Sequence, residues 1–266
     1  MLIASCSVAY STGIVMANFS WLAFVFIFLL AFVFAPYYLQ TKVSTMPEFI
    51  GKRFNPTSRE LLAWYTVLTI LASWLGIPLY SGGLLVTQIM NWPLWVSITA
   101  LVVLSAFFTL AGGLKTVAHT NVFQMSLLII ASFALIVFGL QEAGGIGAVY
   151  HGVPKEFWNL FLSGENANPW YVFLLGYPVL GIWFWCTDQS MVQSVLAAKS
   201  LKHGRYGTAI TGYLKILDMV LFILPGIICL VLFPTLANPD EAYMTMVSEL
   251  LPHGLIGLIM TVLIAA

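Results

Sequence analysis

Long apolar runs alternate with short polar connections along nearly the whole chain. The runs cover residues 8–38, 58–90, 93–112, 117–141, 169–197, 206–234 and 253–266, and charged residues, prolines and glycines separate them. Each complete run can cross a hydrocarbon core about 30 Å thick as a helix that rises about 1.5 Å per residue. The runs lack the period-two alternation of membrane strands, and lipid-exposed backbone must satisfy its hydrogen bonds internally. The pattern therefore predicts an all-α transmembrane protein.

The basic residues fall mainly in alternate connections. Eight of the ten lysines and arginines lie in the first, third and fifth connections, and the second and sixth connections have none. Cytoplasmic loops carry an excess of basic residues, so these three connections are predicted to be cytoplasmic and the first helix to run inward. The eight are Lys42, Lys52, Arg53, Arg59, Lys115, Lys199, Lys202 and Arg205.

Composition agrees with a multi-pass protein of a plasma or inner membrane. Hydrophobic residues make up 61% of the chain and charged residues 8%, with a formal net charge of zero. So few charges cannot cover a water-exposed surface. There is no basic patch that would meet nucleic-acid phosphates, so the bilayer is the expected environment and no nucleic-acid partner is expected.

Features typical of enzymes and metal sites are missing from the sequence. The four histidines are scattered in or near connections, and no HExxH, GxSxG or P-loop motif occurs. Cys6, Cys186 and Cys229 lie far apart in apolar stretches and are expected to be packing residues. We therefore expect no catalytic activity.

The chain is expected to be a single transmembrane domain over residues 1–266 that is incomplete at both ends. The last apolar run, 253–266, is shorter than the roughly 20 residues that a membrane crossing needs. In the sixth connection, Asn238 and Pro239 predict the capped start of a short helix. Its apolar face would hold Tyr243, Met246, Val247 and Leu250.

Three charged residues lie inside the apolar runs, where a charge is costly without a partner or a polar cavity. Lys215 and Asp218 are three positions apart on one predicted helix, so they can form a salt bridge, contact a solute in a cavity, or both. Asp188 lies where an aromatic run becomes polar. Either the helix breaks there, as in transporters with discontinuous helices, or it simply ends at the cytoplasmic interface.

An aromatic run, Trp183, Phe184 and Trp185, precedes Asp188. Aromatic side chains near the end of a membrane helix are usually interface anchors. They could also stack on the C–H face of a sugar ring. The spacing of the run does not decide between these two roles.

Five stretches together resemble the sodium:solute symporter family, most closely its sodium/glucose cotransporter branch. They occur in the family's order and cover nearly the whole chain. The stretches are TMPEFIGKRF (45–54), AGGLKTVAHTNVFQ (111–124), WFWCTDQSMVQSVLAAKS (183–200), GYLK with the later LPG (212–226), and AYMTMVSELLPHGLIGLIM (242–260).

The resemblance implies a fold of two inverted five-helix repeats with a solute site near the midplane. This chain would be a partial version of that fold, with core helices two to seven and the start of eight. The resemblance also implies a coupling sodium ion between core helices one and eight. The backbone carbonyl of Ala266 would be its first ligand on helix eight, so the sodium site would be incomplete in this chain.

The resemblance also assigns candidate solute-binding residues. Lys215 and Trp185 match residues that contact sugar in the glucose branch. Three further positions depart from the branch: Ser20 stands where a glutamate is expected, Phe184 replaces a tyrosine, and Gly181 replaces a polar contact residue. In the fifth core helix Asn121 replaces an aspartate that is linked to cation coupling.

These departures suggest that Asp218, which is not expected at its position, compensates for the missing carboxylate by orienting Lys215. Asp188 and Asn121 are further candidates for pairing or coupling. The resemblance implies a sodium-coupled symporter that moves a small polar solute, a sugar or a polyol, by alternating access. The alternatives are a symporter for an inositol, a carboxylate or an amino acid, and a membrane sensor that keeps the transporter fold.

Overall fold

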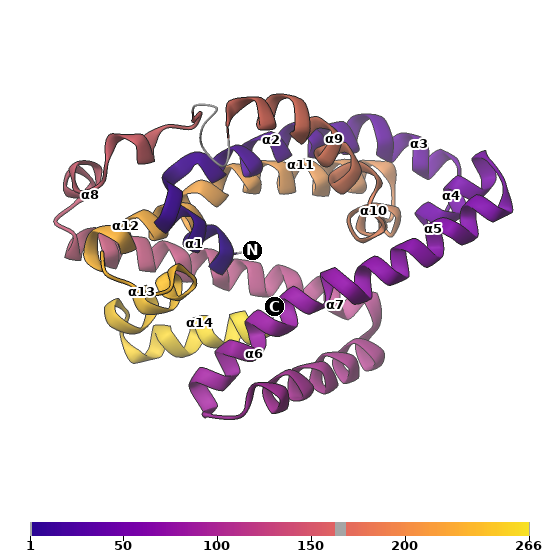
Figure 1. The fold of residues 1–266 in the computed structure, drawn as a ribbon. Coiled ribbons are helices and arrows are strands. Elements are labelled where there is room, and N and C mark those ends of the chain that lie inside the picture. The colour runs from indigo at the N-terminus through magenta and orange to yellow at the C-terminus, as the bar shows by residue number, and fades with distance from the viewer. Residues whose placement is uncertain (1, 163–168, 266) are drawn as a thin grey trace. The chain divides into compact units, whose positions relative to one another are not determined.

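The computed structural model describes residues 2–162 and 169–265, which are almost entirely helical (Figure 1). Five helical runs are long and apolar enough to cross a membrane: Leu2–Gln40, Pro56–Thr87, Leu94–Gly113, Lys115–Glu142 and Leu201–Leu232. Two shorter apolar helices cover Val172–Thr187 and His253–Val262. Within the described ranges no strand forms, apart from an isolated bridge between Leu162 and Pro169. The predicted all-α class is confirmed.

Two runs begin earlier than predicted. The first starts at Leu2 rather than at residue 8, and the sixth starts at Leu201 rather than at residue 206. The sixth run begins earlier because Ser200 caps it, with Ser200 Oγ accepting the His203 amide at 3.3 Å. The beginning of the apolar run therefore predicted a start that is too late for both helices.

The chain divides into two compact units, and each is described by itself. Unit 1 comprises Met1–Thr66 and Gly139–Thr245, and unit 2 comprises Val67–Phe138 and Met246–Ala266. The elements within unit 1 are α1 (Leu2–Thr12), η1 (Gly13–Met16), α2 (Ala17–Leu29), η2 (Leu30–Phe34), α3 (Ala35–Gln40), α4 (Met46–Arg53), α8 (Ile146–Gly152), η4 (Lys155–Trp158), η5 (Val172–Gly176), α9 (Tyr177–Gly181), η6 (Ile182–Thr187), α10 (Gln189–Leu196), α11 (Leu201–Asp218), η7 (Met219–Ile223), α12 (Leu224–Leu232) and η8 (Pro239–Glu241).

Unit 2 holds η3 (Ile70–Trp74), α6 (Gly76–Met90) and α14 (His253–Ala265). Three helices belong partly to each unit: α5 (Pro56–Thr69), α7 (Leu94–Glu142) and α13 (Ala242–Leu250). Of the η elements, η2, η3, η5, η6 and η7 are π-helical turns within longer helices. Such turns widen a helix locally and are frequent at functional sites.

In unit 1, α2 runs alongside α11 (Figure 1). Small residues allow this close packing, as is common between membrane helices. A Cβ atom on Gly212 of α11 would lie 2.8 Å from the Phe28 ring of α2. A buried cluster that includes Ile27, Tyr38 and Cys186 joins α2, α3 and η6. These contacts fix the α2–α11 pair that carries the candidate solute site.

Unit 2 shows two of the predicted connections. Asn91 ends α6 in the left-handed conformation, with φ of 53°, in the predicted second connection. Gly113 breaks α7 with φ of 63°, just before Lys115 in the predicted third connection. On either side of the second connection the Thr87 and Ser97 hydroxyl oxygens lie 3.0 Å apart. The boundaries predicted from Pro, Gly and charge are confirmed at both places.

The sixth connection also has the predicted cap. Asn238 Oδ1 accepts a hydrogen bond from the Asp240 amide at 3.1 Å and starts η8, with Pro239 as its first residue. In the following helix, α13, the side chains of Tyr243, Met246 and Val247 are fully buried. The cysteines Cys6, Cys186 and Cys229 are buried free thiols, as expected for packing residues.

Candidate solute-binding site

A buried ion pair lies on α11 in unit 1. Lys215 Nζ is 2.6 Å from Asp218 Oδ2, and the two side chains are 14% and 11% exposed. The spacing of three residues places both side chains on one face of the helix. Asp218 is the last residue of α11, and the π-helical turn η7 begins directly after it.

Ser20 on α2 joins this pair from across the helix interface. Its hydroxyl donates to Asp218 Oδ2 at 3.2 Å, the same oxygen that receives the Lys215 ammonium. The neighbouring residue, Phe19, accepts a hydrogen bond of 2.5 Å from the Tyr177 hydroxyl at its backbone carbonyl. This bond fixes α2 against α9 where Ser20 points to α11. The residue that replaces the expected glutamate therefore binds the one unexpected carboxylate.

Trp185 brings an aromatic face to the same ammonium group. Lys215 Nζ lies 5.5 Å from the centroid of the Trp185 ring, within the range of a cation–π interaction. Trp185 is 9% exposed and belongs to the π-helical turn η6. Phe184 packs edge-on against it, with ring centroids 4.8 Å apart. Trp185 is thus packed inside unit 1, whereas Trp183 is 38% exposed.

Gly181 has a packing reason to be glycine. A Cβ atom at this position would lie 2.5 Å from a ring carbon of Phe26, far inside van der Waals contact. Phe26 therefore fills the space that a side chain at position 181 would need. The polar side chain that the resemblance expects at this position would clash with that ring.

The helix that carries Trp185 ends at Thr187, so the apolar run over 169–197 is interrupted at Asp188, where the sequence indicated a break or an end. Asp188 is extended, with φ of −67° and ψ of 135°, and caps α10 by accepting the Ser190 amide at 2.9 Å. The Ser190 hydroxyl donates to the same carboxylate oxygen. These local bonds give Asp188 a capping role, and they explain a carboxylate at this position without a partner on another helix.

The two remaining candidates lie elsewhere in the chain. Asn121 is on α7 in unit 2, and its side chain is exposed. Ala266, the expected sodium ligand, lies outside the described residues. Ser20, Trp185 and Lys215 are thus the candidates that the structure brings together, and Asp218 is at their centre.

The four side chains can bind polar groups without any covalent chemistry. A lysine ammonium has three donors, an ionised carboxylate has acceptors only, and a serine hydroxyl has both. Lys215 and Asp218 carry opposite charges, so together they add no net charge to the site. The arrangement therefore suits an uncharged molecule with several hydroxyl groups better than an ion.

The whole chain, residues 1–266, matches the family model of the "Sodium:solute symporter family". The chain belongs to this family. The helices that can cross a membrane agree with the multi-pass membrane proteins of the family. The expectation drawn from the five sequence stretches is confirmed.

Several curated relatives are cotransporters by name. The sodium/myo-inositol cotransporter 2 of Mus musculus is 32% identical over 277 residues, which are 90% of this chain and 41% of that protein. The sodium/glucose cotransporter 1 of the same organism is 29% identical and is matched by 96% of this chain over 45% of its own length. The chain thus spans less than half the length of the relatives it matches.

A solved structure has the same fold. It is described as the substrate-bound outward-open state of a Na+-coupled sialic acid symporter, and it matches 99% of this chain with a TM-score of 0.86. The match covers 57% of that chain at 21% sequence identity, so it shows the fold alone. The partial inverted-repeat transporter fold expected from the resemblance is confirmed.

Sequence analysis missed two contacts of the site. The spacing of Lys215 and Asp218 predicted their pairing, but nothing in the sequence indicated that Ser20, 198 positions before Asp218, would donate to it. The packing of Phe26 against Gly181 was equally hidden, because it depends on how α2 and α9 approach each other. Both are long-range contacts that no local pattern encodes.

Proposed function

We propose that the transporter of which this chain forms a part is a sodium-coupled symporter for an uncharged sugar or polyol. The family and the names of the relatives support sodium as the coupling ion. The observation that carries the choice of solute is the cluster of Lys215, Asp218, Ser20 and Trp185. No bond is made or broken in the solute.

In this proposal Lys215 donates to the hydroxyl oxygens of the solute, and Asp218 accepts from its hydroxyl hydrogens. Trp185 offers an aromatic face for the C–H groups of a sugar or cyclitol ring. Ser20 holds the Asp218 carboxylate in place through its hydroxyl. Asp218 would then supply the negative charge that a glutamate at position 20 supplies in the glucose branch.

The pairing of Lys215 with Asp218 also separates the solute classes. A carboxylate solute would require an unpaired cation, because an anion held next to Asp218 is repelled by it. A neutral polyol meets no such repulsion. We therefore favour a sugar or an inositol over a charged solute.

Transport would follow alternating access. In transporters of the inverted-repeat fold, one bundle moves against another around the site. Ser20, Trp185, Lys215 and Asp218 all belong to unit 1, so the proposed solute contacts would move together. Asn121 belongs to unit 2 and is not part of this group of solute contacts. Its proposed effect on sodium coupling therefore needs a test of its own.

The test is uptake by a chimera in which this chain replaces the matched segment of a sodium/glucose cotransporter. Radiolabelled glucose and myo-inositol would be followed in proteoliposomes with sodium and with potassium, and competitors would include a sugar acid and an amino acid. Sodium-dependent uptake that only neutral polyols inhibit supports the proposal. Binding without uptake would favour the sensor, and inhibition by the charged competitors alone would favour the other symporter classes.

A further inference from the structure

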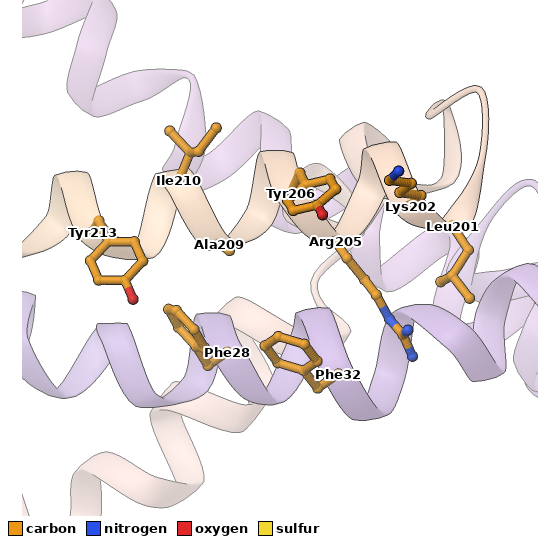
Figure 2. A pocket seen from close by; sticks show the side chains of 9 residues that line it. All are labelled: Phe28, Phe32, Leu201, Lys202, Arg205, Tyr206, Ala209, Ile210 and Tyr213. Atoms are coloured by element: carbon orange, nitrogen blue, oxygen red, sulfur yellow. The ribbon is translucent and has the colours of Figure 1, made fainter.

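A groove of about 770 Å³ lies between α2–η2 and α11 in unit 1 (Figure 2). Its length is lined by apolar and aromatic side chains, and one end carries two basic groups. The volume is within the roughly 300–1,000 Å³ that is usual for small-molecule sites. The side chains that matter are Phe28, Phe32, Ile210 and Tyr213 along the groove, and Lys202 and Arg205 at its end.

The groove is separate from the candidate solute site. Tyr206 lies nine positions before Lys215 and Tyr213 lies two before it, which places them about 180° and 160° away around a helix that turns about 100° per residue. The groove thus occupies the other side of α11. Ile210 and Tyr213 are each 60% exposed, so the described residues leave this side of the helix open.

The basic end of the groove lacks a negative partner. None of the described residues that line the groove is acidic. The Arg205 guanidinium reaches toward the helix that carries Phe32 and lies 5.8 Å from the Phe32 ring (Figure 2). Arg205 Nε is buried, and it has no hydrogen-bond partner within the described part of the chain. The side chain as a whole is only half-buried, so an anion in the groove could accept from its terminal nitrogens in a charge-assisted hydrogen bond.

The position along α11 also favours an anion of the inner leaflet. Lys202 and Arg205 lie in the first turns of α11, which begins at Leu201. The amino end of a helix carries a partial positive charge. The connection before it holds Lys199 as well and is predicted to be cytoplasmic from its basic residues. Anionic lipids are concentrated in the cytoplasmic leaflet and attract such basic groups.

We propose that this groove binds an anionic phospholipid. The phosphate lies at the basic end of the groove and accepts from the terminal nitrogens of Arg205, and an acyl chain lies along Phe28, Phe32 and Ile210. The apolar length of the groove distinguishes this ligand from a free phosphate, which would leave that surface uncovered. Neither the solute site nor its sodium coupling enters this proposal.

Native mass spectrometry of the detergent-purified chain measures the binding directly. The probes are phosphatidylglycerol, phosphatidylcholine with matched acyl chains, and glycerol phosphate, which has the anionic group without the chains. We expect phosphatidylglycerol to bind most tightly and glycerol phosphate to bind least. Equal binding of the two lipids, or binding of glycerol phosphate as tight as that of phosphatidylglycerol, would overturn the proposal.

Charge variants test the basic end. Lys202→Gln and Arg205→Gln should each weaken phosphatidylglycerol binding roughly fivefold, since a basic group near an anionic lipid contributes about that factor. The matched control is Lys199→Gln, which removes an equal charge from the same connection but does not line the groove. If Lys199→Gln weakens binding as much as Arg205→Gln does, the attraction is general and the proposed site is wrong.

Two further variants test the apolar length and the kind of occupant. Ile210→Trp should fill the groove and reduce the binding of both lipids, while the helical circular dichroism spectrum stays unchanged. A photoreactive benzoylphenylalanine in place of Tyr206 should crosslink to phospholipid in vesicles that contain phosphatidylglycerol. A crosslink to a second copy of the chain instead would show that the groove is a protein interface and would overturn the lipid proposal.

Discussion

The hydroxyl of Ser20 on α2 donates a hydrogen bond of 3.2 Å to Oδ2 of Asp218 on α11, the oxygen that also receives the Lys215 ammonium. The contact joins two positions at which this chain departs from the glucose branch. A carboxylate is absent at position 20, and an unexpected one lies within hydrogen-bond distance of it on the neighbouring helix. In the proposed function, Asp218 on α11 supplies next to Lys215 the carboxylate that the family resemblance expects at position 20 on α2.

Removal of the Asp218 carboxylate should weaken solute binding. Asp218→Ala takes the carboxylate partner from an ammonium that is 14% exposed and removes an acceptor for the solute. We expect the affinity for the transported polyol to fall at least about tenfold, because a hydrogen bond to a charged group contributes about 1.5–3 kcal/mol. Equilibrium binding of labelled myo-inositol checks this, with the exposed Glu249→Gln as control. Unchanged affinity in Asp218→Ala would contradict the role assigned to this residue.

A carboxylate at position 20 should be harmful unless Asp218 is changed as well. Ser20→Glu alone places a second negative charge next to Asp218, and like charges so close together repel each other. The double variant Ser20→Glu/Asp218→Asn restores a single carboxylate on α2. We expect a coupling free energy of about 1–3 kcal/mol between the two changes in a double-mutant cycle of solute binding. Strictly additive effects would show that the two positions do not share one function.

The aromatic face at Trp185 should contribute through its π-system rather than through bulk alone. Trp185→Phe keeps an aromatic ring near Lys215, whereas Trp185→Leu keeps only an apolar side chain. We expect solute affinity to fall about threefold further in the leucine variant than in the phenylalanine variant, which corresponds to a cation–π interaction of about 0.5–1 kcal/mol. Isothermal titration of both variants gives the comparison, and equal losses would remove the aromatic role.

A side chain at position 181 should destabilise unit 1. In Gly181→Ala the new Cβ would lie 2.5 Å from the Phe26 ring, so the ring must move. We expect the variant to lose about 1–3 kcal/mol of stability, as in other overpacked cores. The control is Gly147→Ala on α8, where the added atom meets nothing within 4 Å and should leave stability unchanged or raised. Thermal unfolding in detergent, followed by circular dichroism, measures both, and an equally stable Gly181→Ala would contradict the packing account.

The start of α4 should depend on pH through Glu48, which lies outside the membrane-spanning helices. Its carboxylate accepts the Ser44 amide at 2.8 Å and pairs with Lys52 at 3.0 Å, and these contacts, the amide first, lower its pKa below the ordinary 4.5. Because the pKa of Glu48 is lower in the folded chain than in the unfolded chain, its ionised carboxylate stabilises the cap at any pH above the unfolded pKa. That stabilisation is lost as the pH falls through the folded pKa. NMR of labelled glutamate should show titration below 4.5, and Lys52→Met should raise it. An ordinary or higher value in the native chain would contradict the cap.

Much of the fold follows from local rules that the sequence displays. Asn91, Gly113 and Asn238 mark ends and caps of helices where their backbone or side-chain chemistry predicts them. Asp188 was open to two interpretations, because a polar residue after 16 apolar helical residues fits both a helix end and a helix break. In the structure one helix ends at Thr187 and Asp188 caps the next, a geometry that fits both interpretations.

The candidate site was only partly predictable for a physical reason. Lys215 and Asp218 share one helix, so their spacing determines their contact. The hydrogen bond from Ser20 to Asp218 depends on how α2 is rotated against α11, and the contact of Phe26 with Gly181 depends on how α2 is rotated against α9. Packing across the whole interface sets both rotations. The groove on the far side of α11 has the same origin, because Phe28 and Phe32 come from one helix and Arg205 from another.

The most direct test of the central claim is sodium-driven counterflow of labelled myo-inositol and glucose by the chimeric full-length transporter, with Lys215→Met as the variant. Methionine keeps the apolar stem and removes the ammonium that Asp218 and Trp185 contact. Lys155→Met, a basic residue of the fourth connection, is the control. We predict sodium-dependent counterflow in the unmodified chimera and in the Lys155→Met control, and its loss in the Lys215→Met chimera. Undiminished counterflow in Lys215→Met would contradict a solute site built around this ammonium group.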